Sequence, residues 1–390
     1  MAFSPESRLT RRSLLQLACG AGIAVVGGPA TLGLAATTIV QIAAIADSSG
    51  AGAVYGAPVL KGIRLATAEI NAHGGINGHA IHLHISNGRS DPTRIAALVN
   101  TAAGHTSTVA LLGPTLSSEA VIVDRIAQAA GLPVLAVSNT VPGLTRIGDY
   151  IFRLPLGDDR IIPVVLRKAH SQFHFKRPAL LYDDVNAATA AAGKVFRNDV
   201  TNTGLTLVAT ETFTSGATQF SRGLATIGAA KPDVILVSAL AQDAVHILKQ
   251  RLQAGIPATT PVIGANGLNT PAIIQGAGLA ADGVIVGTIF DPTGAQARNR
   301  HFRAAFRTRY RHAPDVFAAQ GYDGVYTVAT ALRHANTTAN RRALRAALAT
   351  LNHVPSVLSA TGQFSMTANR EANLEPTVQI VRNGRFVHFP

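Results

Sequence analysis

Residues 110–140 read ALLGPTLSSEAVIVDRIAQAAGLPVLAVSNT, and they contain one full unit of the pattern that runs through the chain. An apolar run of strand length ends at Gly113-Pro114, a helical pattern begins at Ser117-Ser118, and a second apolar run ends in Ser138-Asn139-Thr140. Strands that alternate with helices form a parallel sheet. Hydroxyl side chains therefore follow the ends of two successive strands, which is where parallel sheets bind their ligands.

The same alternation extends over most of the chain and falls into two series that break near Gly157-Asp158. The first series predicts strands at 38–46, 80–88, 108–114, 133–139 and 150–155, and the second predicts strands at 177–184, 204–213, 232–240, 261–266 and 283–290. Residues 297–351 have a helical pattern and residues 362–389 a β-rich one.

This order predicts an α/β fold of two doubly wound parallel-sheet lobes. A helical segment that follows the second series packs most easily on the first lobe, so we expect several chain crossings, a hinge and a ligand cleft between the lobes. The expected first lobe comprises residues 37–157 plus about 291–352, and the second comprises 158–290 plus about 353–390.

The chain has 390 residues and a formal charge of +13, which is the charge balance of many nucleic-acid binders. However, it has no Trp, few aromatic residues and scattered arginines. The densest arginine cluster, Arg298–Arg311, is typical of the solvated face of a helix whose Phe302, Phe306 and Tyr310 point inward. We therefore expect no nucleic-acid partner.

Residues 1–36 resemble a twin-arginine export signal, with Arg11-Arg12 before a Gly-rich apolar stretch and small residues before Ala36. Cleavage would place the protein in the periplasm. Retention as a membrane anchor is one alternative, and lipoprotein anchoring through Cys19 is another, although residues 16–18 form a poor lipobox. Since Cys19 is the only cysteine, the mature chain has neither a disulfide nor a cysteine-based metal site.

The stretches GIRLA at 62–66 and EINAHGGING at 69–78 resemble the corresponding segment of the periplasmic branched-chain amino-acid binding proteins. Further matches follow in the same order at 90–92, 113–118, 131–134, 138–140 and 321–324, so the resemblance spans residues 38–390. It implies a type I periplasmic-binding fold and a monomeric substrate-binding protein of an ABC importer. Such a protein captures a small carboxylate ligand by hinge closure and delivers it to a permease in the inner membrane.

The start of the helix at Ser117-Ser118 offers free backbone N–H groups and a dipole that favour an anion. Together with Ser138, Asn139 and Thr140, it predicts a carboxylate site made of neutral donors, although serines at such positions often only cap helices. The resemblance matches these residues to the family's carboxylate-holding groups.

Two more residues of the predicted site come from the first lobe and the hinge. The resemblance matches Tyr55 to the aromatic residue that covers the ligand, the alternative being a surface tyrosine in a Gly-rich loop. Asp158 or Asp159, at the crossing between the lobes, either orders the hinge or reaches the ligand, the alternative being a solvated turn.

The second lobe departs from the family pattern. Asn186-Ala187 and Leu240 stand where amino-acid binders have tyrosines, and Asn266 stands where they have the acid that holds the ligand ammonium. This face is therefore more apolar, with Phe290 as a further candidate, unless a shift in alignment brings in Asp183 or Asp184. The ligand is accordingly a branched-chain or other amino acid or a related organic acid. The alternative is a sensing module for an amide, urea or an aromatic acid that acts on a signalling partner.

We expect no enzymatic activity and no cofactor, because the sequence lacks the G-x-S-x-G, H-E-x-x-H and phosphate-loop motifs. His82 and His84 alternate along one predicted strand and could share a metal ion, but no acidic third ligand is near in sequence. We therefore expect no metal site.

Overall fold

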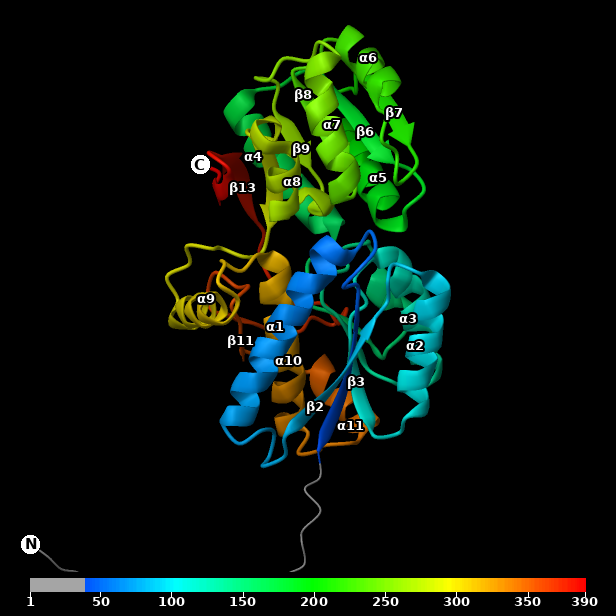
Figure 1. Cartoon of the computed structure of the whole chain (residues 1–390), viewed down its shortest axis with the longest axis vertical. Coiled ribbons are helices and arrows are strands. Elements are labelled where there is room, and N and C mark those ends of the chain that lie inside the picture. Colours follow the sequence, from blue (N-terminus) through cyan, green and yellow to red (C-terminus); the bar gives the residue numbers. More distant parts are fainter. Residues whose placement is uncertain (1–38) are drawn as a thin grey trace, which may run out of the picture. The chain divides into compact units, whose positions relative to one another are not determined.

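The computed structural model describes residues 39–390 (Figure 1). The predicted export signal, with Arg11, Arg12 and Cys19, lies outside the described residues. Within residues 39–390, none of the helices has both the length and the apolar character needed to cross a membrane.

The first lobe is built on a parallel sheet with strand order β2-β1-β3-β4-β5. Three helices connect its first four strands, and α2 begins with the predicted Asp91 cap, whose side chain accepts the N–H groups of Thr93 and Arg94. The bounds are β1 (Val40–Ala46), α1 (Ala53–Ala72), β2 (Ile81–Asn87), α2 (Pro92–Gly104), β3 (Thr108–Leu112), α3 (Ser117–Ala129), β4 (Val134–Ala136) and β5 (Ile151–Arg153).

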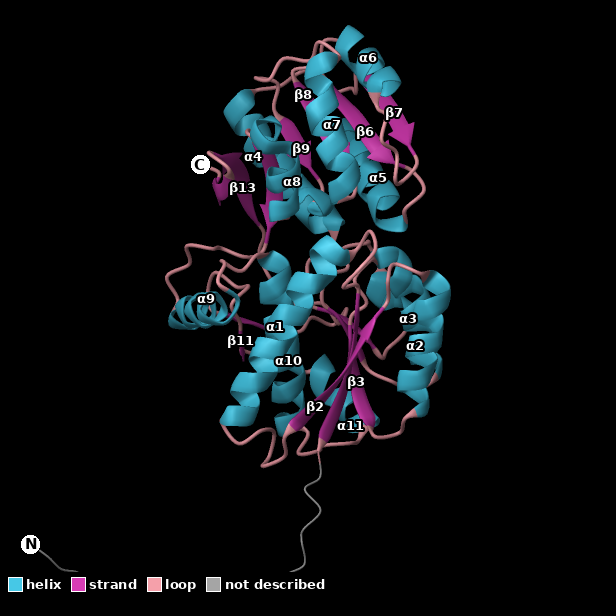
Figure 2. Ribbon diagram, viewed as in Figure 1, coloured by secondary structure: helices cyan, strands magenta, loops and turns pink. Residues whose placement is uncertain are grey.

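The second lobe has a seven-stranded sheet of order β14-β13-β10-β9-β8-β6-β7, in which β13 is antiparallel to both of its neighbours, β10 and β14, and all other pairs are parallel (Figure 2). Its strands are β6 (Pro178–Asp183), β7 (Ala209–Phe213), β8 (Val234–Ser238), β9 (Val262–Gly264), β10 (Val284–Thr288), β13 (Thr377–Arg382) and β14 (Arg385–His388). Its helices are α4 (Asp158–Phe173), α5 (Ala187–Asn202), α6 (Ser221–Ala229), α7 (Ala241–Gln253) and α8 (Pro271–Ala277).

After β10 the chain returns to the first lobe, where α10 (Val316–His334) runs beside α1 (Figure 1). Two glycines permit this contact: a Cβ on Gly62 would lie 1.9 Å from the carbonyl oxygen of Ala318, and a Cβ on Gly321 would lie 2.1 Å from that of Val59. The helix α9 (Ala297–Tyr310) buries Phe302 and Phe306 as predicted, and α11 (Arg341–Ala349) completes the lobe. The prediction of two lobes joined by several crossings is therefore confirmed.

The last crossing comes later than expected. The small sheet of β11 (Val354–Pro355) and β12 (Gln363–Phe364) stays with the first lobe, because Val357 and Leu358 donate their N–H groups to the buried carboxylate of Asp323 in α10. The chain joins the second sheet only at β13, so the expected boundary near residue 353 is too early. The boundary lies later because of long-range hydrogen bonds to Asp323, which a pattern of strands along the sequence cannot reveal.

Candidate functional site

A cavity of about 40 Å³ lies between the two lobes, at the carboxyl ends of their parallel strands. The first lobe contributes residues from the start of α1 and from the loops after β3 and β4, and the second contributes residues from α5, from the end of β8 and from the loop after β9. Seven predicted residues line it: Tyr55, Ser117, Ser138, Thr140, Asp158, Leu240 and Asn266. Ser118, Asn139 and Asn186 are not among its lining residues.

Ser117 is the first residue of α3, and Leu116 occupies the cap position before it. Its Oγ accepts the N–H groups of Thr140 at 3.3 Å and Val141 at 3.4 Å, which draws the loops after β3 and β4 together. Within residues 39–390, the Ser117 hydroxyl proton has no acceptor, and the N–H groups of Ser117 and Ser118 have none either. The head of α3 therefore presents unpaired donors at the cavity, and the alternative that Ser117 merely caps the helix is wrong.

The other two hydroxyl groups are already engaged within the protein. Ser138 donates to the carbonyl oxygen of Thr115 at 2.8 Å, and Thr140 donates from Oγ1 to Oδ2 of Asp158 at 2.8 Å. Ser138 thus ties the two loops together and begins no helix. The Thr140 proton points to a carboxyl group of the protein, so Thr140 departs from the expectation of a free donor, because the neighbouring acid is a strong acceptor.

Asp158 is the acidic group of the cavity. It is the first residue of α4 and only 2% exposed, so it is not in a solvated turn. Its Oδ1 has no hydrogen-bond partner among the described residues. Burial raises the pKa of Asp158 to about 7, against the opposing effects of the Thr140 hydrogen bond and the Arg153 charge. The cavity therefore contains a buried carboxyl group whose pKa lies near neutral pH, and the backbone N–H of Asn266 also favours its ionised form.

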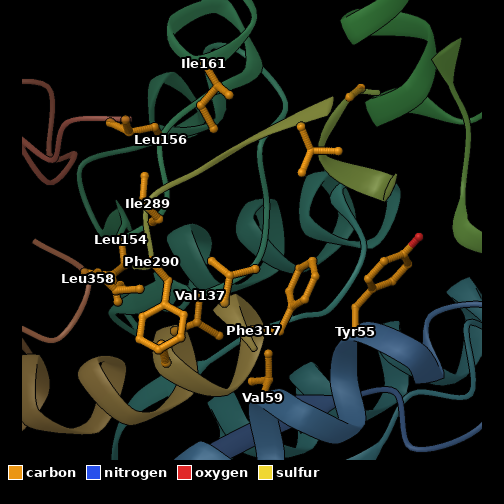
Figure 3. Packing of buried hydrophobic residues seen from close by; sticks show 14 of the residues in the cluster. Tyr55, Val59, Val137, Leu154, Leu156, Ile161, Ile289, Phe290, Phe317 and Leu358 are labelled. Atoms are coloured by element: carbon orange, nitrogen blue, oxygen red, sulfur yellow. The ribbon is translucent and has the colours of Figure 1, made fainter. Parts of the chain in front are cut away.

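Tyr55 connects the two lobes directly. Its Oη donates to the carbonyl oxygen of Gly267 at 2.9 Å and accepts the N–H of Ala241 at 2.7 Å. The ring packs on Phe317 with centroids 5.0 Å apart (Figure 3). Burial raises the pKa of the Tyr55 phenol above its usual value. Tyr55 is therefore a buried helical residue that bridges the cleft, and the alternative of a surface tyrosine is wrong.

The wall from the second lobe is mostly apolar, as the sequence indicated. Leu240 lines it together with six residues that sequence reasoning missed, namely Ala188, Thr189, Ala192, Ser238, Ala265 and Gly267. Ser238 could have been noticed because it ends a buried strand, but its hydroxyl donates to the carbonyl oxygen of Thr189. No Lys, Arg or His of the described residues lines the cavity.

Several second-lobe candidates lie elsewhere. Asn186 caps α5, since its Oδ1 accepts the N–H of Ala188 at 3.0 Å. Asp183 is fully buried, and its carboxylate accepts hydrogen bonds from Val185, Asn186, Thr189 and Ser215, so it holds its own loop together. Asp184 is exposed, and Phe290 lines a different cavity. An alignment shift that brings Asp183 or Asp184 into the cleft is therefore wrong.

Comparison with known proteins gives a consistent result. The chain is 24% identical over 311 residues to the leucine-, isoleucine-, valine-, threonine- and alanine-binding protein of Pseudomonas aeruginosa, covering 80% of this chain and 82% of that protein. A branched-chain amino acid transporter substrate-binding protein from Streptococcus pneumoniae, solved with isoleucine, superposes with a TM-score of 0.82 and 27% identity over 89% of this chain and 97% of that one. A solute-binding protein from R. palustris, solved with benzoate, has a TM-score of 0.79 and 22% identity over 90% and 95%.

The family described as periplasmic binding protein matches residues 39–383, which is nearly all of the described chain. The two lobes, the crossings and the cleft at the strand ends agree with this match. The chain therefore belongs to the periplasmic binding protein family and is a ligand-binding protein of the type I fold.

Proposed function

We propose that this chain is the exported substrate-binding protein of an ABC importer and that it captures a small carboxylate in the interlobe cleft. The observation that carries the proposal is the head of α3, where Ser117 lines the cavity and, among residues 39–390, its hydroxyl proton and the backbone N–H groups of Ser117 and Ser118 have no acceptor. Such a cluster of neutral donors at a helix N-terminus is well suited to a carboxylate.

Asp158 limits which groups the ligand can carry beside its carboxylate. Its free Oδ1 favours a ligand that carries a donor near its carboxylate, and an ammonium group would also keep Asp158 ionised. The small and apolar lining by Ala188, Ala192 and Leu240 favours a short aliphatic side chain. We therefore place small aliphatic α-amino acids first, with organic acids that lack the amine second.

Capture would work by closure around the hinge. The α3 donors and Asp158 hold the polar end of the ligand, and the Tyr55 bridge to Gly267 and Ala241 stabilises the closed arrangement. A ligand favours closure only through contacts that the open form does not make. In this proposal, the closed monomer is recognised by a permease in the inner membrane, after twin-arginine export to the periplasm.

A second candidate is a sensing module for an amide, urea or an aromatic acid that acts on a signalling partner. It is favoured by the uncharged Asn266 and by a second-lobe wall that, in the described part of the chain and apart from Asp158 at the crossing, contributes no acidic side chain to the cavity. Fold alone cannot separate uptake from sensing, because both use the same two-lobed architecture.

The test is a thermal-shift screen followed by calorimetry, using pairs that differ in one group: leucine with leucinamide, leucine with 4-methylpentanoate, and benzoate with benzamide, plus urea. A ligand at 100 times its Kd stabilises the folded chain by about 2.7 kcal/mol. We expect each acid to bind more tightly than its amide. Equal or tighter binding of the amides would refute the carboxylate site and favour the sensing alternative.

A further inference from the structure

A second cavity, of about 220 Å³, also lies between the lobes. The N-terminus of α10 separates it from the first cavity, since Phe317 lines the first and Asp315 and Val316 line the second. Its remaining walls come mainly from the second lobe, from the loop after β9, from β10 and from the β13–β14 hairpin. Any molecule bound there would touch both lobes.

The polar groups around this cavity are mostly acceptors without a partner. Gln379 is 7% exposed and Asn269 is 4% exposed; each uses its amide N–H on a backbone carbonyl, of Phe290 and Gly287 respectively. Among residues 39–390, neither side-chain oxygen has a donor. Thr288 Oγ1 accepts the N–H of Phe290 and keeps its own proton free.

Asp315 adds a negative charge to these acceptors. Its Oδ1 caps α10 by accepting the N–H of Ala318 at 2.9 Å, and the backbone N–H of Phe317 and the charge of His312 also favour the ionised carboxylate. Burial raises the pKa of Asp315 to about 6, so the carboxyl is mostly ionised at neutral pH. The lining cation, Arg385, is exposed on the opposite lobe and forms no ion pair with Asp315.

The apolar part of the lining is equally well defined. Ile274, Phe290, Val316 and Phe386 provide surfaces from both lobes. Such a combination suits a ligand with a compact apolar body and one end rich in hydrogen-bond donors.

We propose that this cavity is a second ligand site, for a small organic cation whose protonated amine or amidine group meets Asp315, Gln379 and Asn269. The body of the ligand packs against Phe290 and Phe386. The site is separate from the carboxylate site in residues and in charge: the first offers donors to an anion, and the second offers acceptors to a cation.

The test uses the full chain and 4-fluorobenzylammonium, with 4-fluorobenzoate as the probe of opposite charge, followed by fluorine NMR. The main variant is Asp315→Asn, which removes the charge but keeps a residue that caps helices well. The matched control is Asp291→Asn, on the neighbouring crossing and outside this cavity. Ala313→Trp, which fills the cavity, is a second variant should Asp315→Asn unfold the chain.

We expect the ammonium probe to bind the wild type and the Asp291→Asn and Ser117→Ala variants alike. Asp315→Asn should weaken binding by about 5-fold to 10-fold, as when a charge-assisted hydrogen bond becomes a neutral one, and Ala313→Trp should abolish it. Equal binding to Asp315→Asn or to Ala313→Trp would overturn the proposal. The proposal would also be overturned if 4-fluorobenzoate bound as tightly as 4-fluorobenzylammonium and lost this binding in Arg385→Gln. Because Ser117→Ala affects only the first site, failure here is distinct from failure of the carboxylate site.

Discussion

Replacing Tyr55 with Phe removes one oxygen atom and both hydrogen bonds that it makes across the cleft. Each such bond contributes about 0.5–1.5 kcal/mol net, so the closed form should lose about 1–3 kcal/mol relative to the open form. Ala241 and Gly267 regain water when the lobes separate, so the open form should be little affected. A loss of 1.4 kcal/mol corresponds to about a tenfold change in affinity.

The assay is calorimetry with the tightest ligand from the screen, together with thermal unfolding of the ligand-free chain. We expect the Kd to rise by about 5-fold to 150-fold. The melting temperature of the ligand-free chain should change little. The matched control is Tyr326→Phe, which removes a 3.0 Å hydrogen bond to Glu69 within the first lobe and should leave the Kd unchanged. An unaltered Kd for Tyr55→Phe, or equal effects of the two substitutions, would refute the bridging role.

Three further predictions concern the first cavity and the packing of the lobes. Ser117→Ala should weaken carboxylate binding by about 1.5–3 kcal/mol, as expected for a hydrogen bond to a charged group, whereas Ser118→Ala keeps its backbone donor and should have little effect by calorimetry. The pKa of Asp158 is raised from 3.8 to about 7, so the folded chain retains a proton that the unfolded chain loses. Stability against urea should therefore fall as pH rises from about 4 to 7 and level off above that, and Asp158→Asn should remove this part of the slope; an identical slope would contradict the assignment. Gly62→Ala places a Cβ against a backbone carbonyl of α10 and should cost about 1–3 kcal/mol in thermal unfolding, whereas Gly104→Ala, whose Cβ would have nothing within 4 Å, should be nearly neutral.

The sequence by itself determined the elements and their order. Strand-length apolar runs, the Asp91 cap and the inward Phe302 and Phe306 are local signals that reach over a few residues, and the structure confirms each of them. The break between the two strand–helix series near Gly157 could be predicted from the sequence for the same reason. The strand ends also identified Ser117 and Ser138 as residues of the cleft, since a parallel sheet brings its carboxyl ends to one edge.

Only the tertiary structure decided what those side chains do. The Tyr55 bridge joins residues 212 positions apart, and the hydrogen bonds of Asp323 to Val357 and Leu358 keep residues beyond 353 on the first lobe. Thr140 donates to Asp158, and Asn186 caps its own helix. In each case the polar side chain pairs with the nearest strong acceptor or free N–H, and this neighbour is known only from the folded structure. Periodicity extends along the chain, whereas hydrogen-bond partners are set by the distances between segments that meet only after folding.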